Sequence, residues 1–379
     1  ECLEEGCGFQ NNPFKTITRA LEMILPSESN PITIHLAEGT YSPDTGEIFP
    51  ISIISNVNLI GAGEDLTTIN AMQTGDSILE YGFIYIENSE NNLISNMTIT
   101  GGDEGVYINN SNPVLSHISI TGNGRHGIEL NNSNANLDYI TITNNTASIG
   151  GGIYLVNSNP TITNTLIMFN SAQKGAGMYL NQSNPILNNL TISNNNASGS
   201  NFFETGEGGG IYATYSNLYL TNSNIMDNRA NLNGGGIYLF NSDSSSLHNV
   251  DIVNNFADEP YNSTGGGLYL ISSNIVIDSL NIDNNSSDYG GGGIYVGNSD
   301  FVINNSIISN NNSGNAGGGG FSISNSNAII SNNVIFNNGG YSGGGCRIKN
   351  SDVEMENVLI DDNHSIGYGG ALIIDNSNL

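Results

Sequence analysis

The chain has 379 residues, of which 35 are acidic and 7 are lysine or arginine, and its formal net charge is −28 at pH 7. Nucleic acids and anionic membrane surfaces bind basic patches, so this charge excludes both as partners and leaves cations and neutral glycans open. The sequence contains no apolar run of about 18 residues, so we expect no membrane insertion within this chain.

The first residues carry two of the three cysteines. Cys2 and Cys7 are close enough in sequence to form a local disulfide, a feature of oxidising compartments, while Cys346 is the odd cysteine. The chain has neither a starting Met nor a signal peptide, so we interpret it as a mature or excised form. These features predict an extracellular or cell-surface protein.

Residues 13–25 are predicted to form an amphipathic helix, with Asn12 as its N-cap and Pro13 at the first helical position. Its apolar face is formed by Phe14, Ile17, Leu21 and Ile24. Longer strand patterns follow up to residue 81. A helix laid over these first coils would cover their open sheet edge, so residues 1–81 are predicted to be an N-terminal cap.

Residues 82–379 repeat one phrase, in which glycines lead into an apolar–variable–apolar triplet such as Ile153-Tyr154-Leu155. Twelve copies occur at spacings of 22 to 33 residues. The leading apolar residues are Ile84, Val106, Ile128, Ile153, Met178, Ile211, Ile237, Leu268, Ile294, Phe321, Cys346 and Leu372. A serine follows each triplet, from Ser89 in the first copy to Ser377 in the last.

Each copy contains three short stretches with apolar residues at every second position, broken by Asn and Gly turns. Such stretches are too short for helices and cannot form a core alone, but stacked coils bury a continuous one. The sequence therefore predicts an all-β, right-handed parallel β-helix solenoid of about 12 regular coils, preceded by N-terminal strands and the helix. Glycines would supply the corner into the first strand, and Asn and Ser would stack on their equivalents in neighbouring coils.

The sequence stops at Leu379, inside a coil and without a cap. An uncovered sheet edge promotes association, so we expect further polypeptide or a neighbouring subunit to cover it.

The N-terminal phrase "NNPFKTITRAL…ITIHLAEGTYSP" resembles the capping region of secreted bacterial β-helix proteins of the pectin-lyase-like superfamily. The coils "NNTASIGGGIYL", "FNSAQKGAGMYL" and "GYGGALII" resemble the repeats of chlamydial polymorphic membrane proteins. Those repeats pair an FxxN-type motif with GGA[I/L/V], whereas GGG is commoner here. The resemblance implies the β-helix fold for residues 9–379, and it implies polysaccharide lyases, hydrolases, adhesins or structural proteins as functions.

One polar cluster is a candidate catalytic site. It consists of Asp103, Glu104, Arg125, His126 and Glu129, and the repeat alignment puts Arg125 over Asp103 and His126 over Glu104. These residues could form a general acid/base pair beside an anion anchor. The favoured interpretation is an exposed ion pair between coils with negligible energetic value. We therefore assign no catalytic residue.

No cofactor is required by these patterns, but Ca²⁺ is a possible ligand of the carboxylates. The candidate cation contacts are Asp361 and Asp362 with Asp375, and Asp251 with Asp283. Asn/Asp turn ladders explain the same residues equally well.

The variable position of the triplet is tyrosine in eight of the twelve copies. These residues are Tyr85, Tyr107, Tyr154, Tyr179, Tyr212, Tyr238, Tyr269 and Tyr295. Stacked aromatics stabilise neighbouring strands by roughly 0.5–1.5 kcal/mol per pair, which is the simpler interpretation. A stripe about 50 Å long could also bind a glycan or a neighbouring molecule. The insertions at 194–207 and 256–264 would place Phe202, Phe203 and Tyr261 beside it.

The leading functional hypothesis is a secreted or surface-attached, non-enzymatic structural or adhesive protein, because the coils are uniform and no catalytic constellation is assembled. Its partner would be an extracellular glycan or a neighbouring protein subunit. The alternative is a carbohydrate-active enzyme, either a polysaccharide lyase or a glycoside hydrolase, or a glycan-binding module.

Overall fold

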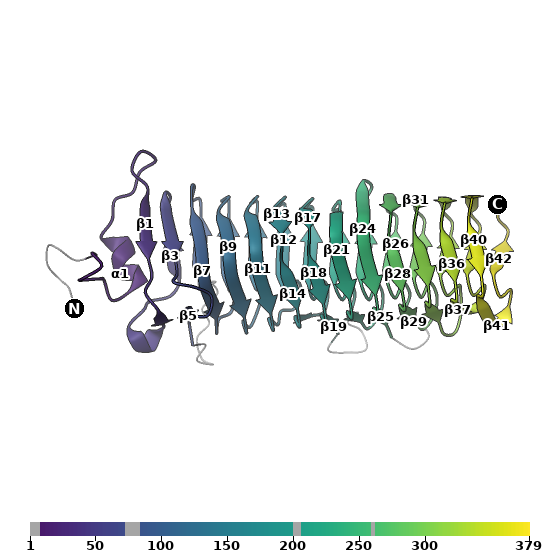
Figure 1. Ribbon diagram of the computed structural model, residues 1–379, viewed down its shortest axis with the longest axis horizontal. Helices are drawn as coiled ribbons and strands as arrows, with labels where there is room; N and C mark the ends of the chain where they lie inside the picture. Colours follow the sequence, from purple (N-terminus) through teal and green to yellow (C-terminus); the bar gives the residue numbers. More distant parts are fainter. Residues whose placement is uncertain (1–7, 73–83, 200–205, 259–261) are drawn as a thin grey trace.

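The computed structural model describes residues 8–72, 84–199, 206–258 and 262–379. They form a straight rod with the two ends of the chain at opposite ends (Figure 1). The candidate disulfide residues Cys2 and Cys7 lie outside the described residues. The fold is an all-β parallel solenoid of about 12 turns, as the repeat predicts.

Three parallel sheets run along the rod in the part of the chain that the structure describes. The long sheet consists of β1 (Ile32–His35), β2 (Gly39–Tyr41), β4 (Val57–Ile60), β5 (Thr67–Asn70), β7 (Leu93–Thr100), β9 (Val114–Thr121), β11 (Asn136–Thr143), β13 (Thr161–Thr163), β14 (Leu166–Met168), β17 (Ile186–Asn188), β18 (Thr191–Ser193), β21 (Tyr219–Met226), β24 (Ser245–Val253), β27 (Ile275–Asp278), β28 (Asn281–Asp283), β31 (Asp300–Asn304), β32 (Ile307–Ser309), β35 (Asn327–Ser331), β36 (Val334–Phe336), β39 (Asp352–Glu356) and β40 (Leu359–Asp361).

The tyrosine sheet consists of β3 (Ile51–Ile53), β6 (Ile84–Glu87), β8 (Val106–Asn109), β10 (Ile128–Asn131), β12 (Ile153–Val156), β16 (Met178–Asn181), β20 (Ile211–Thr214), β23 (Ile237–Phe240), β26 (Leu268–Ile271), β30 (Ile294–Gly297), β34 (Phe321–Ser324), β38 (Cys346–Lys349) and β42 (Leu372–Asp375). The corner sheet consists of β15 (Ser171–Ala172), β19 (Asn196–Ala197), β22 (Arg229–Ala230), β25 (Phe256–Ala257), β29 (Ser286–Ser287), β33 (Asn312–Ser313), β37 (Gly339–Ser342) and β41 (His364–Tyr368).

The glycines act at the corner that enters the tyrosine sheet. Gly150 has a φ of +61°, in the left-handed region that favours glycine. A Cβ on Gly152 would lie 2.4 Å from the carbonyl oxygen of Gly177 in the next coil. Both predicted reasons for the glycines, a special backbone conformation and a close backbone approach, are therefore confirmed.

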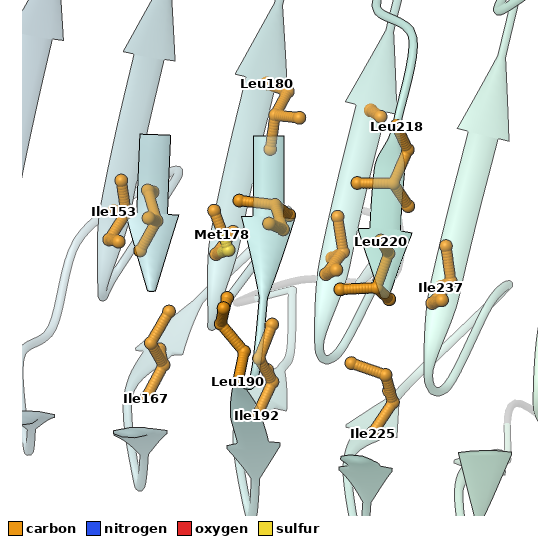
Figure 2. Packing of buried hydrophobic residues seen from close by; sticks show 14 of the residues in the cluster. Ile153, Ile167, Met178, Leu180, Leu190, Ile192, Leu218, Leu220, Ile225 and Ile237 are labelled. Carbon is orange, nitrogen blue, oxygen red and sulfur yellow. The ribbon is translucent and has the colours of Figure 1, made fainter. Parts of the chain in front are cut away.

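The core is a continuous column of aliphatic side chains between the tyrosine sheet and the long sheet. Figure 2 shows Ile153 and Met178 from the first wall and Ile192 from the second among these buried side chains. Every second residue of a strand points inward, and in-register stacking places each inward residue over its equivalent. Cys346 fills the same position as Phe321 in the preceding coil and is fully buried.

Buried asparagines form a second column at the turn before the corner sheet. Asn145 donates from its backbone N–H and from Nδ2 to Asn170 Oδ1, both at 3.0 Å, and Asn170 repeats the pattern with Asn195. Serines form a matching column after the tyrosine sheet, where the backbone N–H of Ser133 donates to Ser158 Oγ at 3.0 Å. The predicted stacking of Asn and Ser on their equivalents is confirmed.

The N-terminal helix is shorter than predicted. Helix α1 spans Ile17–Glu22, and Thr16 is its N-cap in place of Asn12. Glu47 explains the difference, because its carboxylate accepts hydrogen bonds from the N–H groups of Ile17 at 2.6 Å and Thr18 at 3.0 Å. Ile17 is buried in the core, so the helix does pack against the first coils. A short 3₁₀ turn, η1 (Pro43–Thr45), precedes Glu47.

Among the described residues, no helix is long and apolar enough to cross a membrane.

Candidate functional site

The predicted tyrosines lie in one column on the outer face of the tyrosine sheet, paired in register from coil to coil. From Tyr154 to Tyr295 the six rings form an unbroken stack with centroids 4.6 to 5.4 Å apart. Tyr85 and Tyr107 form a separate stacked pair at 5.1 Å.

Stacking covers the ring faces that would otherwise contact a ligand. Only 7% of Tyr212 and 9% of Tyr238 is exposed. Lys174 lies 5.1 Å from the centroid of the Tyr212 ring and forms a 2.8 Å ion pair with Glu207. What the column offers a ligand is ring edges and hydroxyls, and its binding role stays a prediction. Phe202, Phe203 and Tyr261 lie outside the described residues.

The column is interrupted at Glu129, and the polar cluster lies at this interruption. Glu129 pairs with Tyr107 below and Tyr154 above. The ring of His126 stacks on Tyr154 at 4.7 Å and so continues the stack beneath it. The predicted register is confirmed, because Ile128 pairs with Val106, which sets His126 over Glu104 and Arg125 over Asp103.

The contacts of the cluster differ from the predicted ones. Arg125 forms an ion pair with Glu104, at 2.7 Å, and its backbone N–H donates to the carbonyl oxygen of Asp103. The predicted ion pair between coils is therefore present, but its predicted exposure is wrong for the carboxylate. Only 2% of the Glu104 side chain is exposed, whereas half of the Arg125 side chain is. The glycine-rich corner explains the burial, because it draws the backbone of adjacent coils together around Glu104.

Three buried side chains form the centre of the cluster: Glu104, His126 and Glu129. One possible ligand atom from each lies within 4.8 Å of the other two. His126 Nε2 is 3.7 Å from Glu129 Oε2, which is longer than a hydrogen bond. Glu104 Oε2 is buried and accepts no hydrogen bond from a donor group among the described residues, and the Glu104 carboxyl lies within hydrogen-bonding reach of the Glu129 carboxylate.

Burial dominates the electrostatics of this centre. It raises the pKa of the Glu104 carboxyl to about 8, with the nearby charge of Glu129 acting in the same direction and Arg125 opposing it. Burial also lowers the pKa of His126, so that its imidazole is neutral at pH 7. A protonated carboxyl beside a carboxylate could donate and accept protons in general acid/base catalysis. A polymeric substrate, however, has no access to Glu104 and His126, whose side chains are 2% and 5% exposed.

The other predicted cation contacts do not converge. Asp361 lies on β40 in the long sheet and Asp375 on β42 in the tyrosine sheet, while Asp251 pairs with Asn281 instead of Asp283. In the described ranges, Glu104, His126 and Glu129 are the one group of three or more His, Cys, Asp or Glu residues with converging ligand atoms.

An apolar groove, which the sequence analysis missed, runs along the outer face of the long sheet. It encloses about 1000 Å³ across β24, β27, β31, β35 and β39. Val276, Val302 and Ile329 stack in register along its floor, and about half of Val276 and of Ile329 is exposed. Its rim is polar and is formed by Asp243, Asn274, Asp300, Asn327 and Asp352.

The groove could not be predicted from the sequence of any single coil. Each floor residue is a single apolar side chain on an outward position, which is ordinary for a protein surface. The signal is a β-branched residue at this same outward position in three consecutive coils. An alignment of the coils on their second strand would have found it.

The model of the family described as "Right handed beta helix region" matches residues 63–212 and 200–314. No curated protein matches the sequence.

Three solved structures match most of the chain at low sequence identity and with TM-scores under 0.5. A mannuronan C-5 epimerase A-module from Azotobacter vinelandii is 13% identical, with a TM-score of 0.41, 93% of this chain covered and 92% of that one. An α-1,3-glucanase catalytic unit from Streptomyces thermodiastaticus is 11% identical, with a TM-score of 0.40 and coverage of 86% and 62%. A surface adhesin of Streptococcus pneumoniae is 13% identical, with a TM-score of 0.37 and coverage of 90% and 85%.

Proposed function

Since the chain belongs to the family of right-handed β-helix proteins, we propose that it is an extracellular adhesive rod that binds an uncharged carbohydrate chain without altering it. The apolar groove on the long sheet carries this proposal. The groove follows the axis of the rod over five coils, so an extended polymer can contact equivalent residues in successive coils.

The chemistry of the groove suits a neutral polysaccharide. Its floor offers apolar contacts for the carbon faces of sugar rings, and its rim offers carboxylates and amides that hydrogen-bond to hydroxyl groups. The net charge of −28 opposes an anionic polymer and also opposes a second copy of this chain.

The non-enzymatic part of the proposal rests on the polar cluster. Glu104 and His126 are the best acid/base pair in the described residues, and both are less than 5% exposed. A glycosidic bond cannot approach them in this arrangement.

The extracellular part rests on the resemblance of the coils to the repeats of chlamydial surface proteins. Protease treatment of intact cells tests it, since an exposed rod would be cleaved or released while cytoplasmic proteins stay intact.

A glycan array with neutral and uronate oligosaccharides tests the binding function. We expect neutral chains to bind, and Val276→Glu and Ile329→Glu to abolish binding. Ile307→Glu is the matched control, because Ile307 is an equally exposed apolar residue on β32 of the same sheet and lies outside the groove. Equal loss in all three variants, or none in any, would overturn the assignment of the groove.

A screen for reducing sugars and unsaturated products on polysaccharides tests the absence of catalysis. Robust turnover that is lost in a His126→Ala variant would show that the protein is an enzyme acting at the polar cluster.

A further inference from the structure

We propose that Glu104, His126 and Glu129 bind a divalent transition-metal ion, with Zn²⁺ as the best match, and that the ion joins two adjacent coils of the rod. Glu104 belongs to the coil of β8, whereas His126 and Glu129 belong to the coil of β10. This site is independent of the groove and of the adhesive function.

The first argument is that each of the three side chains has one polar atom held by the protein and one directed inward. Arg125 binds Glu104 Oε1, which leaves Glu104 Oε2 buried without a hydrogen-bond donor among the described residues. Asn131 Nδ2 donates to Glu129 Oε1 at 2.6 Å, which leaves Glu129 Oε2 toward His126.

The second argument concerns the tautomer of His126. Its Nδ1 lies 2.8 Å from the carbonyl oxygen of Gly150, so the ring nitrogen must carry the proton there and donate it. Nε2 then presents a lone pair toward Glu129. A backbone carbonyl that holds Nδ1–H is the usual outer partner of a metal-binding histidine, and stacking on Tyr154 fixes the ring plane.

The third argument is geometric. Two acceptor atoms, Nε2 of His126 and Oε2 of Glu129, face each other at 3.7 Å with no hydrogen bond between them. Metal–ligand bonds of about 2.0–2.2 Å in a tetrahedral site separate neighbouring ligand atoms by about 3.4 Å. The separation therefore suits two ligands of one ion, and the free oxygen of Glu104 is close enough to be the third.

The donor set selects the class of ion. One imidazole nitrogen with two carboxylates suits Zn²⁺ and related transition metals, whereas Ca²⁺ prefers six to eight oxygen ligands.

The test is the metal content of the protein. After chelator treatment, the full chain is incubated with Zn²⁺, dialysed against metal-free buffer and analysed by elemental mass spectrometry. We expect one Zn²⁺ per chain, which an equal concentration of Ca²⁺ does not displace. Substitution with Co²⁺ is expected to give the strong visible absorption of a four-coordinate ion.

Three variants and one control locate the site. Glu104→Gln, His126→Gln and Glu129→Gln are each expected to lose the bound ion. Asn131→Ala removes only an outer partner and is expected to weaken binding roughly 10- to 100-fold. His248→Gln is the control, because His248 forms an exposed 2.9 Å pair with Asp278 and should not affect stoichiometry.

Circular dichroism shows whether each variant folds. If a ligand variant does not fold, Asn131→Ala still tests the proposal, because it removes no proposed ligand. A wild-type protein without a stoichiometric ion would overturn the proposal, and so would equal retention of Zn²⁺ in the folded ligand variants. Glycan binding is measured separately, so failure of this site and failure of the groove are distinguishable.

Discussion

The buried asparagine column makes a specific prediction about stability. Asn228 is fully buried, and its Oδ1 accepts hydrogen bonds from the backbone N–H and from Nδ2 of Asn195, both at 3.0 Å. Its Nδ2 donates to the carbonyl oxygen of Ile192 at 2.8 Å. Replacement by alanine removes all of these bonds while the backbone keeps its conformation.

The magnitude follows from the groups left behind. Asn228→Ala leaves the backbone N–H of Asn195 without its partner and one N–H of Asn195 Nδ2 unpaired, since Nδ2 keeps only its bond to the carbonyl oxygen of Ile167. Each buried N–H left unpaired costs about 1–3 kcal/mol. We therefore expect a loss of about 2–6 kcal/mol in the free energy of unfolding, together with a small cavity. The matched control is Asn224→Ala on β21, a half-buried outward position whose loss should stay within about 0.5 kcal/mol.

Two measurements check this prediction. Urea unfolding followed by circular dichroism gives the overall change. Hydrogen exchange in the native state reports on the coil itself, because 2 kcal/mol of local destabilisation accelerates exchange of the Asn195 amide roughly 30-fold. A loss below about 1 kcal/mol, or exchange in the Asn195 coil no faster than in distant coils, would refute the idea that the column stabilises the stack.

Three further predictions concern the tyrosine sheet. Tyr238→Ala should destabilise the protein in urea by about 1–3 kcal/mol, because two stacked pairs are lost, whereas Tyr238→Phe should cost less than about 0.5 kcal/mol; similar losses in both variants would argue against stacking. Burial raises the pKa of the Tyr212, Tyr238 and Tyr269 hydroxyls in the folded protein. The free energy of unfolding is therefore unaffected by these groups below their unfolded-state pKa of about 10, and it falls as pH rises above that value, because only the unfolded chain ionises readily. Phenolate absorbance from these rings should therefore appear only with unfolding, and the reasoning fails if all tyrosines ionise near pH 10 while the circular dichroism is unchanged. Burial raises the pKa of the Cys346 thiol to about 12, so a thiol reagent at pH 8 should label it only in denaturant; rapid labelling of the folded protein would contradict its place in the core.

Much of the fold could be predicted because the repeat imposes its own register. Once Ile153 and Met178 are aligned by their glycines, the pairing of Tyr154 with Tyr179 follows, and the structure has that pairing. The start of the helix could not be predicted, because the carboxylate that caps Ile17 belongs to Glu47, 30 residues away.

The candidate site was only partly predictable for a similar reason. Alignment placed His126 over Glu104, but charge alone suggested an exposed pair. The burial of Glu104 depends on how closely Gly105 and Gly127 bring two coils together, since a Cβ on Gly105 would lie 2.5 Å from the carbonyl oxygen of Gly127. Such packing depends on the distance between the backbones of adjacent coils, which residue types alone do not predict.

The asparagine column also determines how such a molecule can change in length. Each Asn of this column bonds to the equivalent Asn one coil away, as Asn255 does with Asn285. A duplicated coil inserted between them would meet the same partners on both sides, and a deleted coil would leave matching surfaces to rejoin. Gene duplication can thus extend or shorten the rod in steps of about 4.8 Å without a compensating mutation, which makes the length of the rod an evolvable quantity.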